Sequence, residues 1–148
     1  MTRVFTHTLR VRWSEVDLQK VVFNGHYLNY FDVAFTEFMR TSGLPGALQQ
    51  HAAGFELFAK KASVEYHAPA HFDDELHLTV QPVKLGNTSV VFAIDVWRGG
   101  EDGMSSGAGQ RVRVVSGELV YVYVHTAAMQ PTPWPPVWRA AFAPRMLG

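Results

Sequence analysis

Apolar and polar residues alternate along the first part of the chain, as they do in a strand that buries one face. The apolar positions are Phe5, Leu9, Val11 and Trp13. Residues 26–41 follow a different pattern, in which apolar side chains cover most of the circumference of a helix. We therefore predict a strand over residues 5–13 and a long, largely buried helix over residues 26–41. Asn24 is its expected N-cap and Gly43 its expected C-cap.

Most of the remaining chain shows the patterns of strands and turns. A short helix is expected over residues 45–53, and further strands are expected within residues 55–67, 75–81, 89–98 and 110–125. The Gly- and Ser-rich residues 99–109 predict a flexible hairpin loop, and Gly117 suggests a bulge inside the last strand. From about residue 130 a proline-rich tail is expected to lie extended on the surface.

This order of elements predicts an α+β fold in one domain, residues 1–148. Successive long strands joined by short turns favour antiparallel pairing. Such a sheet can curl around the single apolar helix and bury it. The outer face of the sheet would still carry Val, Trp and Tyr side chains, which suggests pairing with a second subunit.

Composition narrows the possible functions. Of 148 residues 47% are hydrophobic, and the formal net charge is zero, so a general nucleic-acid or membrane-surface role has no electrostatic support. The absence of cysteine excludes disulfides, a thiolate nucleophile and cysteine-ligated metals. The N-terminal residues are too polar for a signal peptide, and no apolar run is long enough to span a bilayer. We therefore expect a cytoplasmic location.

Asp17 lies in the short segment between the first predicted strand and the long helix. The first N–H groups of a helix lack partners and attract negative charge, so a carbonyl bound there would be polarised. A nearby carboxylate could attack that carbonyl or activate water against it, which suggests acyl transfer. Spacing alone also allows a solvated loop residue or a helix cap.

Three motifs resemble a known family. They are Glu15-Val16-Asp17 with Val21-Val22-Phe23 and Tyr27-Leu28, then the segment from Ser63 to Leu76, then Lys84-Leu85-Gly86-Asn87-Thr88-Ser89. In this order they resemble the hot dog-fold acyl-CoA thioesterases of the 4-hydroxybenzoyl-CoA thioesterase type. The chain departs from the family pattern at Lys20, where Gly is frequent, and at Asn24, where His or Tyr is frequent.

The resemblance implies a hot dog fold, in which a five-stranded antiparallel sheet wraps one long buried helix. It also implies an acyl-CoA thioesterase that needs no cofactor, with Asp17 as nucleophile or general base. The helix N-terminus would form the oxyanion hole, through backbone N–H groups of His26 and Tyr27. A homodimer or homotetramer is expected.

The resemblance also implies two sets of binding residues. The acyl group would contact Phe23, Asn24, Gly25, His26, Tyr27, Asp32 and Ser63. Coenzyme A would contact Lys60, Lys61, Lys84, Gly86, Asn87, Thr88 and Ser89, because phosphates bind cationic side chains and loop N–H groups. For each set the ordinary alternatives stay open. They are capping for Asn24, core packing for Tyr27 and Ser63, a partner across a subunit interface for Asp32, and simple solvation for the lysines.

Other functions fit the sequence less well. Glu15 is expected to be structural, paired with Arg12 or Arg10. His67, His71 and His77 have no zinc-ligand spacing, and Ser105-Ser106 lacks the setting of a serine nucleophile, so neither a metal site nor a serine hydrolase is expected. A hot dog dehydratase for hydroxyacyl thioesters would need a paired His and acid in a tunnel. A non-catalytic protein that binds acyl-CoA or an acyl-carrier thioester remains a rival.

Overall fold

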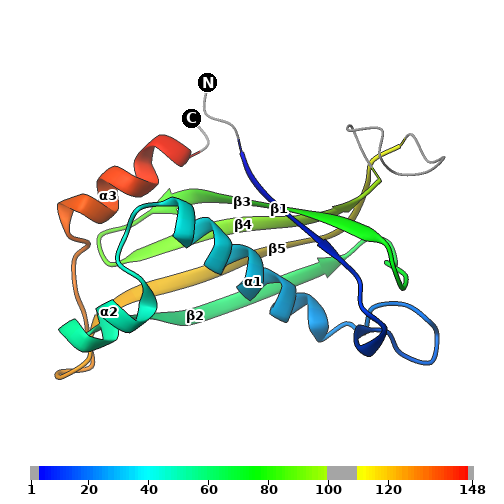
Figure 1. Cartoon of the computed structure of the whole chain (residues 1–148). Helices are drawn as coiled ribbons and strands as arrows, with labels where there is room; N and C mark the ends of the chain where they lie inside the picture. The colour runs from blue at the N-terminus through cyan, green and yellow to red at the C-terminus, as the bar shows by residue number, and fades with distance from the viewer. Residues whose placement is uncertain (1–3, 100–109, 147–148) are drawn as a thin grey trace.

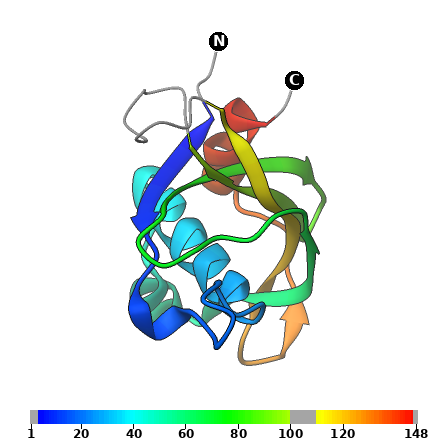
Figure 2. The same cartoon turned by 90° about the vertical axis from the view of Figure 1, so that its right-hand side faces the viewer.

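One long helix lies against the concave face of a single sheet in the computed structural model, which describes residues 4–99 and 110–146 (Figures 1 and 2). The helix is α1, His26–Thr41. The five long strands are β1 Phe5–Arg10, β2 Phe55–Tyr66, β3 Glu75–Leu85, β4 Ser89–Arg98 and β5 Val112–His125. All pairs are antiparallel, in the order β1-β3-β4-β5-β2, and the two-residue β6, Gln130–Pro131, pairs with β5. The predicted α+β hot dog architecture is confirmed.

The core lies between α1 and the inner face of the sheet. On β3 and β4 every second residue is fully buried, as alternation requires. The α1 residues that face them are Tyr27, Tyr30, Phe31, Ala34, Phe35 and Phe38. The opposite face of α1 is exposed and includes Leu28, Asp32 and Val33. The prediction of a largely buried helix is therefore wrong for the single chain, because the sheet covers only one side of α1.

The segment before α1 differs from its prediction. The first strand ends at Arg10, and Trp13–Glu15 form a 3-10 turn. Glu15 accepts hydrogen bonds from the backbone and side chain of Arg12, which closes this turn and ends the strand. Gly25, and not Asn24, is the N-cap of α1.

Gly117 does not mark a bulge, because it continues the register between Val64 and Ile94. A side chain there would have no space: a Cβ atom would lie 2.4 Å from Phe31 Cε2 and 2.4 Å from the carbonyl oxygen of Ser63. The register shifts instead between Ala59 and Lys61, between Pro82 and Lys84, and between Val96 and Trp97. The short helix α2, Ala47–Ala53, forms as predicted.

The C-terminal region corrects the expectation of an extended surface tail. Helix α3, Pro136–Phe142, and a 3-10 turn, Ala143–Arg145, follow the proline-rich segment. Trp134, Trp138 and Phe142 are buried and contact one another. Helical spacing places Trp138 and Phe142 on one face of α3, and Trp134 packs against both from the segment before the helix. A proline at the start of α3 suits the first turn of a helix. The predicted loop of residues 99–109, with Ser105-Ser106, lies almost entirely outside the described residues.

Candidate active site

Asp17 occupies the first position of a tight turn in a small hairpin between β1 and α1. Its N–H donates to the Val21 carbonyl at 3.0 Å, and its carbonyl accepts from the Lys20 N–H at 2.8 Å. Val16 and Val22 form a β-bridge on the next rung. Lys20 has φ of 65°, a left-handed conformation that suits glycine better than residues with a Cβ. Lys20 therefore occupies a position where the backbone conformation favours glycine, the residue that is frequent there in the family that the sequence resembles.

The Asp17 side chain is half-buried and has a defined structural contact. Its Oδ1 atom accepts the N–H of Gln19 at 2.8 Å, which forms an Asx turn. This bond orients the carboxylate, and it is also what an ordinary turn aspartate would make. No second hydrogen-bond partner contacts this carboxylate within residues 4–99 and 110–146.

Glu15 fastens this hairpin to α1. Its Oε1 atom accepts the hydroxyl of Tyr30 at 2.8 Å, and its Oε2 atom accepts Arg12 Nη2 at 2.6 Å. Burial alone would raise the pKa of Glu15, but hydrogen bonds from Arg12 and Tyr30 outweigh it and hold the pKa below its ordinary range. The expected pairing with Arg12 is confirmed, whereas Arg10 contacts Asp73 and Glu75 instead.

The N-terminus of α1 begins directly after this hairpin. The His26 N–H donates to the Phe23 carbonyl at 2.9 Å, and the Tyr27 N–H makes a long bond of 3.4 Å to the Asn24 carbonyl. Among the described residues the Leu28 N–H has no hydrogen-bond partner. The N–H groups available to a ligand are therefore those of Leu28 and, weakly held, Tyr27, because the N–H of His26 is already used.

The side chains at this end of α1 divide into exposed and buried groups. Phe23 and Asn24 are exposed, and Phe23 packs edge-on against the His26 ring. A Cβ on Gly25 would lie 3.2 Å from the Phe23 ring, so this glycine allows the close approach. Tyr27 is a core residue, and burial raises its pKa to about 12. The core alternative thus holds for Tyr27, whereas Phe23 and Asn24 are exposed and His26 is partly exposed at the surface.

Tyr66, for which the sequence pattern predicts no role, lies at this end of α1. Its hydroxyl donates to the Asn24 carbonyl at 3.1 Å, and its ring contacts Tyr27. The side chain is exposed, so a phenol hydroxyl stands at the surface beside the start of α1. The sequence signal that could have identified Tyr66 is its position in the segment from Ser63 to Leu76, which resembles the family.

The comparisons with known proteins identify the family of this chain. Residues 19–105 match the family model of the thioesterase superfamily. The chain belongs to the thioesterase superfamily. The predicted enzyme class, a thioester hydrolase, is therefore confirmed at the level of the family.

Three similar proteins illustrate the match. A putative esterase of Aquifex aeolicus is 34% identical over 64% of this chain and 73% of its own. The acyl-CoA thioester hydrolase YbgC of Escherichia coli O6:H1 is 32% identical over 62% of this chain and 67% of its own. The crystal structure of a 4-hydroxybenzoyl-CoA thioesterase variant bound to 4-hydroxybenzoyl-CoA has a TM-score of 0.83 at 16% identity, covering 95% of this chain and 99% of its own. This last likeness concerns the fold.

Two residues expected to contact the acyl group lie away from Asp17 in this thioesterase. Asp32 lines a cavity of about 610 Å³ between the second half of α1, α2 and the sheet, and neither Asp17 nor residues 23–27 line it. Ser63 is exposed on β2, and alternation with Val64, which packs on the core, turns it to the outer face of the sheet.

The residues expected to bind coenzyme A form two separate groups. Lys60 and Lys61 are exposed on β2, at a register shift. Lys84 and residues 86–89 lie at the β3–β4 turn, at the opposite end of the sheet from the Asp17 hairpin (Figure 1). Arg139 of α3 donates to the Gly86 carbonyl at 2.9 Å, so the C-terminal helix holds this turn. A single chain does not bring the turn to Asp17.

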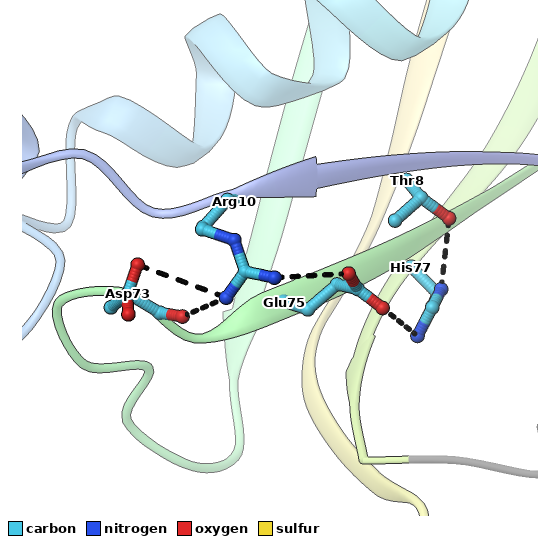
Figure 3. A network of polar contacts seen from close by, with 5 residues as sticks. All are labelled: Thr8, Arg10, Asp73, Glu75 and His77. Atoms are coloured by element: carbon cyan, nitrogen blue, oxygen red, sulfur yellow. Dashed lines mark hydrogen bonds and ion pairs between the residues drawn. The ribbon is translucent and has the colours of Figure 1, made fainter. Parts of the chain in front are cut away.

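The histidines make contacts typical of polar surface networks. His77 lies between Thr8 and Glu75, in the group that also joins Arg10 to Asp73 (Figure 3). His67 contacts Ser116, and His71 lies near Asp74. Within the described residues no three potential ligands gather in a way that could hold a metal ion. Over the same residues, none of the helices combines the length and the apolar character needed to cross a bilayer.

Proposed function

We propose that this protein hydrolyses acyl-CoA thioesters, with Asp17 as nucleophile or general base. The observation that carries the proposal is the hydrogen-bonded hairpin, which joins an oriented Asp17 carboxylate to the start of α1. Glu15 and Tyr30 fasten this hairpin to the helix. In a chain of the thioesterase superfamily, an oriented carboxylate on the segment that leads into α1, together with N–H groups without partners at the start of that helix, supports this role.

The chemistry follows from these positions. The thioester carbonyl would lie at the start of α1, where the N–H groups of Leu28 and Tyr27 can stabilise the negative oxygen of the tetrahedral intermediate. As nucleophile, Asp17 would attack the carbonyl carbon and release the CoA thiolate, leaving a mixed anhydride that water hydrolyses. As general base, it would take a proton from water while that water attacks the carbonyl carbon. The tetrahedral intermediate would then collapse by breaking the C–S bond, and the released CoA thiolate would take up the proton.

The substrate site extends beyond one chain in this proposal. Because residues 84–89 lie far from Asp17 within the chain, they would bind the phosphates of a CoA whose thioester lies in the site of another subunit. Two surfaces support a homodimer or homotetramer. The edge of β2 has no neighbouring strand in the described sheet, and the outer face of α1 carries exposed Leu28 and Val33. The expected cytoplasmic location remains a prediction.

The test is thiol release from a panel of acyl-CoAs by the natural protein and by Asp17→Asn. Asparagine keeps a side-chain oxygen for the Gln19 N–H, so the turn should persist, but it is neither a nucleophile nor a base. We expect turnover to fall by at least about a hundredfold with unchanged circular dichroism and melting temperature. Turnover near the natural level in this variant would refute the role of Asp17. Tight acyl-CoA binding without thiol release by the natural protein would favour the rival, a non-catalytic binding protein.

A further inference from the structure

The cavity beside α1 has the size and lining of a small-molecule site. Its volume is about 610 Å³, within the range usual for ligand pockets. Most of its wall is apolar, with contributions from Phe35, Met39, Leu44, Leu48 and Leu57. It lies against the second half of α1, the helix whose N-terminus forms the proposed reaction site.

One polar group on the cavity wall, the Tyr121 hydroxyl, has no hydrogen-bond partner among the described residues. The Tyr121 residue is only 9% exposed, but its hydroxyl is not among the fully buried polar atoms that lack a partner, so it opens to the cavity, where water can bind it. Its ring is stacked on Phe35 at 4.3 Å between centroids, which fixes where the hydroxyl points. A tail that fills the cavity displaces this water, so a ligand that offers an acceptor here keeps the hydroxyl paired, whereas a ligand that offers none leaves it unsatisfied at a cost.

The charges around the hydroxyl favour a neutral acceptor. Burial and the negative charge of Asp32 raise the pKa of Tyr121 to about 12, so the hydroxyl stays a donor at neutral pH. Asp32 would also repel an anionic group. The other charged side chains of the wall, Arg40 and Glu56, are paired with Glu37 and His51.

The cavity is within reach of the start of α1. Leu28 and Asp32 are separated by one helical turn and lie on the same exposed face. A helix rises about 1.5 Å per residue, so the cavity rim at Asp32 begins about 6 Å along the axis from Leu28. An acyl tail that leaves a thioester near the Leu28 N–H can therefore follow this face into the cavity.

We infer that this cavity binds the acyl tail and that the Tyr121 hydroxyl selects tails carrying a neutral oxygen acceptor, such as a ketone, remote from the thioester. The inference rests on the proposed thioesterase function and specifies its substrate class. A plain alkyl tail fills the same apolar space but leaves the hydroxyl unpaired. Tails too short to enter the cavity gain nothing from it.

The test compares decanoyl-CoA with its analogue that carries a ketone next to the terminal methyl group. We expect the natural protein to hydrolyse the oxo-substrate with the higher kcat/KM. Tyr121→Phe should lower the ratio of the two kcat/KM values about tenfold, the worth of one hydrogen bond to a neutral acceptor. Tyr123→Phe is the matched control, because Tyr123 is also buried on β5 but does not line the cavity. It should leave the ratio unchanged.

A second variant tests the space itself. Ala47 lines the cavity and is exposed on α2, so Ala47→Phe should reduce the volume without disturbing the core. We expect hydrolysis of decanoyl-CoA to weaken relative to butyryl-CoA.

An unchanged chain-length profile, together with an unchanged ratio in Tyr121→Phe, would overturn the inference while leaving the proposed function intact. If no thioester is hydrolysed, the proposed function fails. Calorimetry would then measure the affinities of the two CoA esters for the natural protein and for Tyr121→Phe. The inference predicts that Tyr121→Phe lowers the ratio of these affinities about tenfold.

Discussion

At the scale of single residues, Glu15 links the proposed catalytic loop to the core. Its side chain is buried and accepts hydrogen bonds from four donors: the Tyr30 hydroxyl and the backbone N–H, Nε and Nη2 of Arg12. The Tyr30 bond is the direct tie between the Asp17 hairpin and α1. Any change that weakens it should loosen the position of Asp17.

The lowered pKa of Glu15 predicts an acid-sensitive contribution to stability. A carboxyl whose folded pKa lies below its unfolded value stabilises the fold above the unfolded pKa, and loses that effect as the pH falls through the folded pKa. We expect Glu15→Gln to cost about 2 kcal/mol of unfolding free energy at neutral pH. The difference from the natural protein should shrink below pH 4.5, the ordinary value for this group.

Urea denaturation across this pH range measures the effect. Glu75→Gln is a suitable control, since its exposed pair with Arg10 should contribute less than about 1 kcal/mol. A cost of Glu15→Gln that stays constant from neutral to acid pH would contradict the assignment.

At the scale of elements, close packing explains why β5 carries a glycine inside a long strand. Gly117 lies against the Phe31 ring of α1 and the backbone of Ser63. The sequence shows the glycine but not its neighbour across the core, so a bulge was the natural prediction. Only the register of β5 between β2 and β4 identifies the cause.

Gly117→Ala should therefore destabilise the fold. A methyl group at 2.4 Å from both neighbours forces the ring or the strand to move, and overpacking of this kind typically costs about 1 to 3 kcal/mol. Gly46→Ala is the control, because no atom lies within 4 Å of its Cβ position. Equal melting temperatures for the two variants would show that the packing at Gly117 is relaxed.

Helix α3 shows a second limit of sequence patterns. Proline predicts an extended segment correctly as far as residue 135, but Trp134, Trp138 and Phe142 then bury their rings against the sheet. The four-residue spacing of these rings was present in the sequence. The prediction followed the proline content and not this spacing, although Pro136 lies in the first turn of α3, the one helical turn where proline is favourable.

The two interpretations of this region predict different mutant behaviour. Trp138 is 3% exposed, so Trp138→Ala should cost about 3 to 5 kcal/mol, as a core substitution does. A tryptophan on an extended surface tail would be almost silent. Val137, next to it and 59% exposed, provides the control Val137→Ala. Thermal unfolding separates the two outcomes.

At the scale of the whole molecule, alternation and motif order were enough to predict the fold and the Asp17 loop. They were not enough to complete the site. The pattern could place residues along strands, yet the turn at residues 86–89 lies at the far end of β3, about 35 Å of strand from the Asp17 side. A site that uses both groups needs a second chain, which no pattern within one sequence describes directly.

A last prediction follows from this incomplete site. If the exposed face of α1 and the free edge of β2 bind a second subunit, charges placed there should produce monomers.

Val33 on α1 and Phe58 on β2 are exposed and line neither the Asp17 hairpin nor the cavity, so Val33→Glu with Phe58→Glu is the variant of choice. Light scattering should show a dimer or tetramer for the natural protein and a folded monomer for the variant. Thiol release should fall with the oligomer, because each site would lose the residues supplied by its neighbour. Val137→Glu places an equal charge at an exposed position of α3 and should change neither property. A natural protein that is monomeric and active would show that one chain suffices.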